Sequence, residues 1–332
     1  MRDERLARWF QDGWASPNTV RASAPSTVAN LGPGFDVFGL ALNLFSDVVE
    51  VQVIDCGVEV VAGGRFGHLV PLDPKGNTAG VVALKLLELA GVDFGLRLRI
   101  WKGVRPGYGL GSSGCSAAAS ALAVNELLGL GLSKEELIPI AALGELASSG
   151  AAHADNVSAS LLGGLTIVRS YEPLDVVKLE PPENLVLAVC IPLVDVPEKK
   201  TEYARALLPK DVELRQMVHN VAHASALIAG VALGDVELIG KAMNDCVVEP
   251  VRAKLIPAYE EVRRRALQAG ACGVAIGGAG PTMIAVVDGW KGDASEVAEA
   301  MREAFAQFGI EAEAHVAKPD LEGAKILPPR EG

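Results

Sequence analysis

A glycine-rich stretch at residues 107–116, GYGLGSSGCS, holds the residues best suited to chemistry. Its first three glycines let the backbone wrap closely around an anion. Ser112, Ser113 and Gly114 follow at the start of a predicted helix, where free N–H groups point at a phosphate and a hydroxyl can reach a phosphate-bound Mg²⁺. We therefore predict a phosphate-binding loop. The alternative is a glycine-rich loop that only leads into a closely packed alanine-rich helix.

Two better-known phosphate loops do not fit this stretch. Gly109–Gly114 matches the dinucleotide pattern G-x-G-x-x-G. A dinucleotide-binding unit, however, needs a second parallel strand after its helix, ending in an acidic residue about 20 positions on. Here Leu128 is followed by another predicted helix. The Walker A loop is excluded as well, because no Lys-Ser or Lys-Thr pair follows the glycines.

Predicted strands and helices alternate along the chain. These elements must hold the glycine-rich loop in position. Apolar residues alternate at 95–101, as in a strand, and the loop at 103–111 joins that strand to an Ala/Ser-rich helix at 112–128. The next helix, 133–146, begins with a capping box of Ser133 and Glu136. Further strands are predicted at 19–24, 47–54, 165–169, 185–191, 273–276, 283–287 and 310–316, and further helices at 77–90, 257–269 and 293–308. The acidic, proline-containing segment 171–182 is the predicted domain boundary.

Composition limits the class of protein. A length of 332 residues predicts about two domains. Half of the residues are apolar and 21% are charged, which excludes a disordered chain. The net charge of −11 comes without a run of five like charges, so we expect no nucleic-acid partner. The five cysteines are widely spaced and form no C-x-x-C pair, so we expect a reducing cytoplasm and no zinc.

Neither a signal peptide nor a membrane span is expected. Residues 1–18 carry several charges but no apolar core. The longest apolar stretches, such as 185–194 with Pro192 inside, fall short of the ~20 residues that a membrane span needs. We therefore expect no membrane partner, and a short N-terminal extension at 1–18 whose role is not assigned.

Three motifs resemble those of the small-molecule kinases named for galactose, homoserine, mevalonate and phosphomevalonate, the GHMP kinases. They are PGYGLGSSGCSAAAS at 106–120, APSTVANLGPGFDVFGLAL at 24–42 and GGAGPT at 277–282. From about Thr19 onward the chain is most similar to the members that phosphorylate homoserine, through GELASSGAAHADNV at 144–157 and EPVRAKLIP at 249–257. The motif at 277–282 has Ala279 where relatives commonly carry Ser, so one hydroxyl contact is absent.

The resemblance implies a two-domain α+β fold, the GHMP kinase fold. After the extension at 1–18, residues 19–170 would form the N-terminal ATP-binding domain, which is β-rich, has an unusual crossover and is of the ribosomal S5 domain 2-like type. Residues 171–332 would form the ferredoxin-like C-terminal domain. The site is then expected in the cleft between the two domains.

For the nucleotide, the resemblance implies ATP held by the glycine-rich loop and Mg²⁺ held by Ser113 and Glu145. One hydroxyl and one carboxylate suit a hard octahedral cation. The alternative for Glu145 is a surface acid in the last turn of a helix. Asn77 and Lys102 match positions that meet the nucleotide base, with solvated loop residues as the alternative. The loop positions expected to contact ATP are Gly107, Tyr108, Gly109, Leu110, Gly111, Ser112, Ser113 and Gly114.

The acceptor imposes its own requirement. Homoserine carries an ammonium, a carboxylate and the hydroxyl to be phosphorylated, so its pocket should offer carboxylates at one end and two-donor arginines at the other. The residues at acceptor-site positions of the family are Asn30, Asp36, Asp155, Arg205, Arg252 and Gly278. Each one alone has an ordinary alternative, such as a surface charge, an Asx turn or a helix cap. Their joint occurrence at family positions favours the functional interpretation.

Asn156 lies where the mevalonate and galactose kinases have an Asp as candidate base. An amide cannot accept a proton in that role. The resemblance therefore implies in-line transfer by positioning and electrostatics, with Asn156 holding the acceptor hydroxyl and Thr201 near the phosphate. A hydrolase that uses Ser113 with His153 and Asp155 is disfavoured, because the chain has no G-x-S-x-G elbow there.

The sequence thus predicts an enzyme that uses ATP to phosphorylate L-homoserine to O-phospho-L-homoserine in threonine biosynthesis, in the cytoplasm and as a homodimer. One alternative is a GHMP kinase that acts on mevalonate or shikimate. Neither of these substrates has an ammonium group to pair with Asp36 and Asp155. The other is a non-catalytic nucleotide-binding regulator, which gains nothing from keeping Glu145 and Asn156 together with two arginines.

Overall fold

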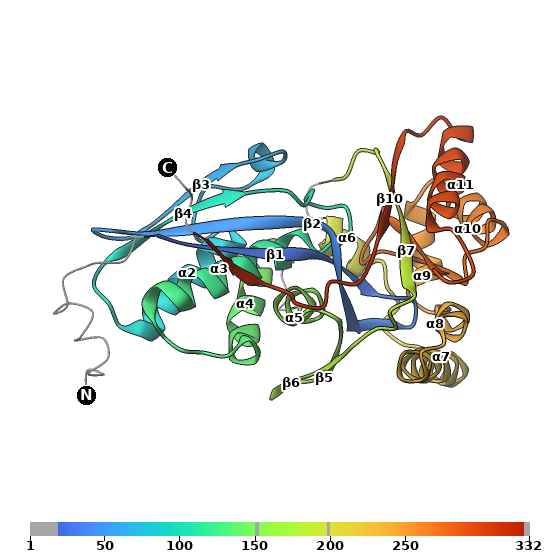
Figure 1. The fold of residues 1–332 in the computed structure, drawn as a ribbon, viewed down its shortest axis with the longest axis horizontal. Coiled ribbons are helices and arrows are strands. Elements are labelled where there is room, and N and C mark those ends of the chain that lie inside the picture. Colours follow the sequence, from blue (N-terminus) through green and yellow to red (C-terminus); the bar gives the residue numbers. More distant parts are fainter. Residues whose placement is uncertain (1–18, 150–152, 198–199, 329–332) are drawn as a thin grey trace.

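The computed structural model describes residues 19–149, 153–197 and 200–328. The predicted extension at residues 1–18 lies outside this part. Figure 1 shows two units side by side, each with its own sheet and its own covering helices. Among the described residues, no helix combines the length and the apolar character that crossing a bilayer requires.

The first unit is built on a seven-stranded sheet. Its main strand order is β11-β1-β2-β4-β3, with β5 and β6 as a hairpin attached to β2. All pairs are antiparallel except β3 with β4. The strands are β1 (Thr19–Asn30), β2 (Gly34–Ile54), β3 (Val58–Gly63), β4 (Gly95–Trp101), β5 (Leu165–Tyr171), β6 (Leu174–Leu179) and β11 (Lys325–Leu327).

Four helices cover one face of this sheet: α2 (Thr78–Ala90), α3 (Ser112–Leu128), α4 (Lys134–Ser149) and α5 (Asp155–Leu162). The central one is α3, whose side chains are buried along almost its whole length. Its alanines and serines let the three other helices and the sheet approach it closely, so that the predicted loop-to-helix junction at Ser112 is fixed by packing on all sides.

The second unit has a four-stranded antiparallel sheet in the order β10-β7-β9-β8. Its strands are β7 (Leu185–Pro192), β8 (Gly273–Ile276), β9 (Met283–Asp288) and β10 (Ala312–Ala317). An apolar core joins one face of this sheet to α10 (Tyr259–Gln268) and α11 (Ala294–Gln307), while α7 (Leu214–Leu233) and α8 (Val236–Ala242) lie toward the first unit. The short elements are η1 (Gly67–Leu69), α6 (Lys200–Ala206), α9 (Glu249–Arg252) and η2 (Ala253–Leu255).

The architecture confirms the predicted α+β class. The segment 171–182, however, is not a plain linker, because it contains β6, which pairs with β5 in the first sheet. The C-terminal segment also returns, since β11 pairs with β1 at the edge of that sheet. The division at residues 170 and 171 remains a prediction of domain boundaries, and the sheets themselves change over between Leu179 and Leu185.

Candidate active site

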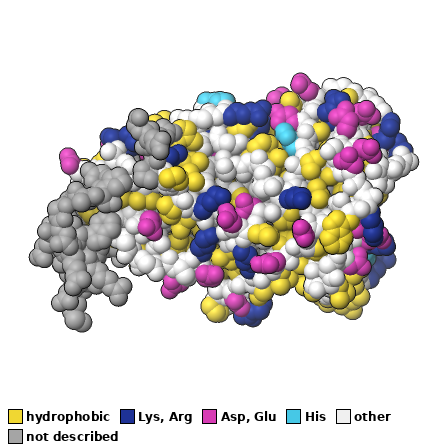
Figure 2. All heavy atoms as spheres, viewed as in Figure 1, with side chains coloured by type: hydrophobic (Ala, Val, Ile, Leu, Met, Phe, Trp, Pro, Cys, Tyr) yellow, Lys and Arg dark blue, Asp and Glu magenta, His cyan; other side chains and the backbone are white. Residues whose placement is uncertain are grey.

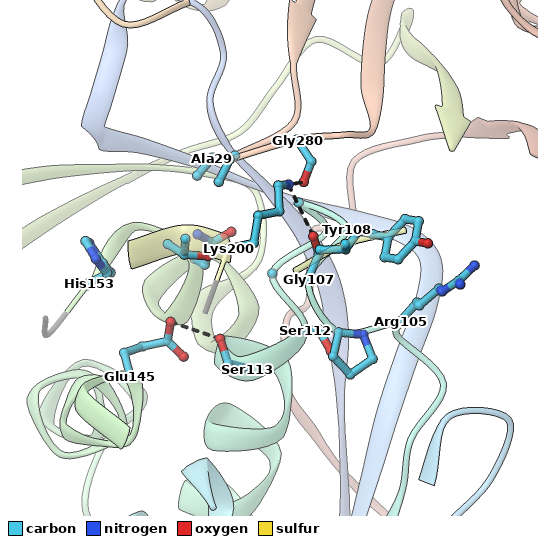
Figure 3. A pocket seen from close by; sticks show the side chains of 18 of the residues that line it. Ala29, Arg105, Gly107, Tyr108, Ser112, Ser113, Glu145, His153, Lys200 and Gly280 are labelled. Atoms are coloured by element: carbon cyan, nitrogen blue, oxygen red, sulfur yellow. Dashed lines mark hydrogen bonds between the residues drawn. The ribbon is translucent and has the colours of Figure 1, made fainter. Parts of the chain in front are cut away.

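A cavity of about 760 Å³ lies where the loops of the two units meet. Most of the residues singled out from the sequence line it: Asn30, Asp36, Asn77, Lys102, Gly107, Tyr108, Gly109, Gly111, Ser112, Ser113, Glu145, Asp155, Asn156, Thr201, Arg205, Arg252 and Gly278. Two do not. Leu110 is directed into the apolar core, and Gly114 is buried in the first turn of α3 against Asn156. Figure 3 shows the glycine-rich loop and Glu145 on opposite sides of Ser113.

The glycine-rich loop has left-handed backbone at Gly107, Gly109 and Gly111, and at the last two a Cβ would also collide with the neighbouring chain. Gly109 has φ of +80°, and a Cβ there would lie 2.0 Å from the carbonyl oxygen of Gly277. Gly111, the N-cap of α3, has φ of +64°, and its Cβ would lie 1.8 Å from the Thr27 hydroxyl. A side chain at either position is therefore excluded by conformation and by space. The glycine loops of the two units pack directly on one another.

Lys102 supports this loop from below. Its ammonium donates hydrogen bonds to the Asp47 carboxylate, to the carbonyl of Ser112 at 2.6 Å and to the Ser116 hydroxyl at 2.7 Å. Asp47 in turn accepts from the backbone N–H groups of Gly103 and Val104. All three N–H donors of Lys102 are thus used within the protein. The predicted contact with the nucleotide base stays untested, and the geometry gives this side chain a supporting role.

Asn77 is the N-cap of α2. Its side-chain oxygen accepts from the N–H of Gly80 at 3.0 Å, and its amide donates to the carbonyl of Pro71 at 2.7 Å. Both ends of the amide therefore hold local structure at the rim of the cavity. Its predicted contact with the base also stays a prediction.

The predicted metal ligands face each other. The Ser113 hydroxyl donates to Glu145 Oε2 at 3.0 Å across the N-terminus of α3 (Figure 3). Glu145 is only 5% exposed, and burial raises the pKa of its carboxyl to about 7 although the Ser113 hydrogen bond lowers it. A half-buried hydroxyl and a buried carboxylate beside a phosphate-type loop are the oxygen ligands that a hard divalent cation prefers, so these residues fit Mg²⁺.

At the other end of the cavity, Asp36 and Arg205 form an ion pair. Arg205 Nη2 lies 2.7 Å from Asp36 Oδ1 and 2.8 Å from Oδ2, and His153 Nδ1 lies 3.6 Å from Oδ1. Burial by itself raises the pKa of Asp36, but the hydrogen bonds from His153 and Arg205 outweigh it and hold the pKa below its usual value. Asp36 has φ of +59°, uncommon for a residue with a side chain, and the Tyr171 hydroxyl donates to its carbonyl at 3.0 Å.

A second arginine and a glycine complete this end. The carbonyl of Gly278 accepts from Asn30 Nδ2 at 2.9 Å and from Arg252 Nη1 at 2.8 Å. Arg252 is only 4% exposed, and burial lowers its pKa, as does the nearby Arg205. The guanidinium groups of both arginines lie 5.0 Å from the centre of the Phe35 ring. The aromatic ring therefore stabilises two cations that converge on the cavity.

Asp155 and Asn156 open α5 between these two ends. Burial raises the pKa of Asp155, and the neighbouring Asp36 charge adds to that effect. Asp155 Oδ1 accepts from the backbone N–H of Asn156 at 2.7 Å. The side-chain oxygen of Asn156 accepts from the Thr27 hydroxyl at 2.7 Å, which fixes the orientation of the amide. Thr27 has a part in the site that the sequence analysis did not assign.

Lys200 is one of three charged residues lining the cavity that the sequence analysis missed, together with Arg105 and Asp195. Its ammonium donates to the carbonyls of Gly107, at 3.2 Å, and Gly280, and so connects the glycine loops of the two units (Figure 3). Burial lowers the pKa of Lys200 to about 7, and the nearby Arg252 adds to the effect. In the sequence, only the position of Lys200 next to Thr201 could have pointed to the site. Nothing in the local sequence indicates that the Lys200 side chain reaches two loops.

Comparisons with known proteins agree with this geometry. The model of the GHMP kinases N terminal domain matches residues 77–164, and that of the GHMP kinases C terminal domain matches residues 225–307. The chain belongs to the GHMP kinase family.

Within that family its relatives are homoserine kinases. The homoserine kinase of Methanocella arvoryzae is 46% identical over 90% of this chain and 93% of its own length, and that of Methanococcus maripaludis is 42% identical over 80% and 87%. The crystal structure of homoserine kinase from Cytophaga hutchinsonii superimposes with a TM-score of 0.88 at 37% identity, covering 95% of this chain and 99% of that one. The chain is therefore placed among the homoserine kinases.

Proposed function

We propose that this chain transfers the γ-phosphoryl group of ATP to the side-chain hydroxyl of L-homoserine and releases O-phospho-L-homoserine, a step of threonine biosynthesis. The observation that carries the proposal is that one cavity holds both halves of the site: a glycine-rich loop at a helix N-terminus lies at one end, and the Asp36–Arg205 ion pair lies at the other. Phosphate and a zwitterionic amino acid would thus be bound in adjacent parts of one site.

On the nucleotide side, the backbone N–H groups at the start of α3 would hold the phosphates, helped by the positive end of the helix dipole. We propose that Ser113 and Glu145 hold Mg²⁺, which when bound neutralises charge on the phosphates. Lys200 adds an amino group, whose pKa burial lowers to about 7, between the two glycine loops.

On the acceptor side, the substrate would replace an existing ion pair. The homoserine ammonium would take the place of Arg205 beside Asp36, with Asp155 close by, and the carboxylate would be bound by Arg205 and Arg252. Each protein charge keeps an opposite charge after this exchange, so a zwitterion enters without leaving a buried charge unpaired. Asn30 and Gly278 would position Arg252 at this end of the pocket, because the Gly278 carbonyl accepts hydrogen bonds from both the Asn30 amide and the Arg252 guanidinium.

The hydroxyl would be held by Asn156, whose amide is oriented by Thr27, with Thr201 near the transferred phosphoryl group. No carboxylate stands at the position of Asn156, so the transfer would be driven by positioning and charge stabilisation rather than by a side-chain base. We also propose that the enzyme acts in the cytoplasm, consistent with five free cysteines, and that it works as a homodimer.

The substrate assignment predicts the outcome of a panel assay. Mg·ATP should be consumed with L-homoserine and should not be consumed above background with mevalonate, shikimate, galactose or buffer alone. The physical reason is the pair of opposite charges at the acceptor end, which only a zwitterion matches. ADP release and phosphorus NMR of the product provide the measurement, and equal turnover of mevalonate would contradict the proposal.

The two arginines provide a separate prediction. Arg252→Lys and Arg205→Lys should each raise KM for homoserine by roughly tenfold or more, because lysine keeps the charge but loses the planar two-donor fork. KM for ATP should stay within about twofold. The control is Arg264→Lys, since Arg264 is an exposed residue of α10 that pairs with Glu261. Unchanged homoserine KM in both variants would remove the arginines from the acceptor site.

A further inference from the structure

Lys200 brings an amino group to the boundary between the two halves of the site. It is the first residue of α6, the helix that also carries Arg205 of the acceptor end. Its side chain reaches the nucleotide end, where Nζ donates to the carbonyls of Gly107 and Gly280, one from each glycine loop (Figure 3). The amino group therefore lies between the predicted phosphate-binding loop and the acceptor pocket.

The amino group of Lys200 has no anionic partner among the described residues. Both of its hydrogen-bond acceptors are neutral carbonyl oxygens, and the charge that acts on it is that of Arg252, which repels it. Basic and acidic side chains lie close together on the face shown in Figure 2, and Lys102 in the same cavity is paired with Asp47. A cation in a cavity is costly without an opposite charge, so the Lys200 position is suited to an anion that a ligand brings.

We propose that the Lys200 ammonium binds the γ-phosphoryl group of ATP, and that the side chain takes up a proton from solvent when the nucleotide binds. The proposal rests on the proposed function, because that function places ATP on the glycine-rich loop and homoserine beside Arg205. A phosphoryl group that passes between these two places comes within reach of Nζ. The flexible stem of four carbons lets the ammonium exchange the two carbonyl oxygens for phosphate oxygens.

A second cation at this place supplies what the transfer requires. Asn156 cannot act as a base, so the reaction depends on stabilising the negative charge of the phosphoryl group in transit. Ser113 and Glu145 would hold Mg²⁺ on the side of the first unit, whereas Lys200 comes from the second unit, and Figure 3 shows the two places apart in the cavity. The phosphoryl group would thus have a positive charge on each side.

The proton uptake follows from the pKa of Lys200. Burial and the nearby Arg252 lower this pKa to about 7, so at pH 8 about nine-tenths of the amino groups are unprotonated in the free enzyme. A bound phosphate favours the ammonium form and raises the pKa again. Binding at pH 8 should therefore add about one proton, and binding at pH 6, where the group is already protonated, should add little.

The other ionisable groups around the cavity give different signals. Those on the elements next to Lys200 are Arg105 and Tyr108 of the glycine-rich loop, Asp195 before α6, Arg205 of α6 and Arg252 of α9. The guanidinium groups stay protonated, and burial raises the pKa of Tyr108 further above neutrality. Glu145, with a pKa of about 7, would release its proton on binding Mg²⁺, a change of opposite sign. The difference between wild type and Lys200 variants therefore isolates the contribution of Lys200.

Calorimetry counts this proton. Titration of Mg·ATP without homoserine at pH 8, in buffers of different ionisation enthalpy, gives the number of protons taken up on binding. Wild-type protein should take up about one proton, and Lys200→Met and Lys200→Arg about one fewer, because methionine cannot be protonated and arginine already is. Mg·ADP, which lacks the γ-phosphoryl group, should give less than about half of the wild-type uptake.

The matched control is Lys178→Met. Lys178 also donates to two carbonyls, those of Leu162 at 2.7 Å and Leu321 at 2.9 Å, but it does not line the cavity. This variant should keep the wild-type proton count. No uptake by the wild type, the same uptake in folded Lys200 variants, or equal uptake with Mg·ADP would refute the proposal. If Lys200→Met does not fold, Lys200→Arg decides, because it keeps the charge at this position.

Activity gives a second readout. Lys200→Met should lower kcat for homoserine phosphorylation by about tenfold or more, and Lys200→Arg should restore part of it. In the wild type, kcat/KM for ATP should fall as pH rises above about 7, since the free enzyme loses the Lys200 proton, and this fall should be absent in Lys200→Arg. An unchanged alkaline limb in that variant would contradict the role of Lys200. A wild-type protein that binds Mg·ATP with proton uptake but does not phosphorylate homoserine would instead contradict the proposed function.

Discussion

Replacing Glu145 with glutamine should lower kcat by about a hundredfold or more, with the KM for homoserine changed by less than about threefold. Glutamine keeps the shape of the side chain and an oxygen that can accept from Ser113, but it removes the negative charge. The charge is what a divalent cation on the phosphates requires, and its effect is greatest while the phosphoryl group is in transit. Ser113→Ala should give a smaller loss in the same direction.

The measurement combines initial rates over a Mg²⁺ titration with calorimetry of Mg·ATP binding. The matched control is Glu135→Gln, in the first turn of the same helix α4, where the side chain is exposed. We expect this control to leave both readouts unchanged. If Glu145→Gln and Ser113→Ala kept near-normal kcat and Mg²⁺ dependence, the assignment of these two residues to the metal would be wrong.

Replacing Lys102 with methionine should reduce the free energy of unfolding by about 3–5 kcal/mol. Methionine fills similar space, so the cost comes from charge. Asp47 is fully buried and would lose its cation, and the carboxylate would remain in a site from which water is excluded. Because Asp47 also holds the N–H groups of Gly103 and Val104, the glycine-rich loop should lose order and ATP affinity should fall with stability.

Urea unfolding followed by circular dichroism measures this effect. Lys85→Met is the control, since Lys85 is an exposed lysine of α2 whose only ion pair is with Glu88, and it should change stability by no more than about 0.5 kcal/mol. A variant at Lys102 that retained full stability and lost only ATP affinity would contradict the supporting role. It would instead favour the contact with the nucleotide base that the sequence predicts.

Local sequence patterns were sufficient to predict the strands and helices that are stabilised mainly by interactions within the element. The alternating strand 95–101 and the helix 112–128 have the predicted bounds, and the capping box of Ser133 and Glu136 is present with both hydrogen bonds. In contrast, β2 continues from 34 through the second half of the N-terminal motif, where glycines obscure the strand pattern. The strand β6 follows Pro173 in an acidic segment, and its stability comes from pairing with β5, a tertiary contact that the periodicity does not report.

The functional site likewise has features that the local sequence predicts and features that depend on tertiary contacts. The glycine-rich loop could be predicted because its chemistry depends on the types and order of neighbouring residues. The partner of Lys102 could not, because Asp47 lies 55 residues away and reaches it only through the folded sheet. Phe35 could not be placed between two arginines for the same reason, since Arg205 and Arg252 come from separate helices of the other unit. The resemblance of the motifs indicated which residues line the site. It did not indicate which of them contact one another.

The path of the chain between the two sheets limits how the cavity can open. The polypeptide leaves the first sheet after Leu179 and returns to it at Lys325, so the whole second unit is inserted between two strands of the first. The returning segment is anchored along its length, for example by the hydrogen bond from the N–H of Ala324 to the carbonyl of Leu161. A body held at two crossing points cannot swivel freely. Two connections restrict the relative rotation of the two units more than a single linker would, and so help to keep the two glycine loops in contact.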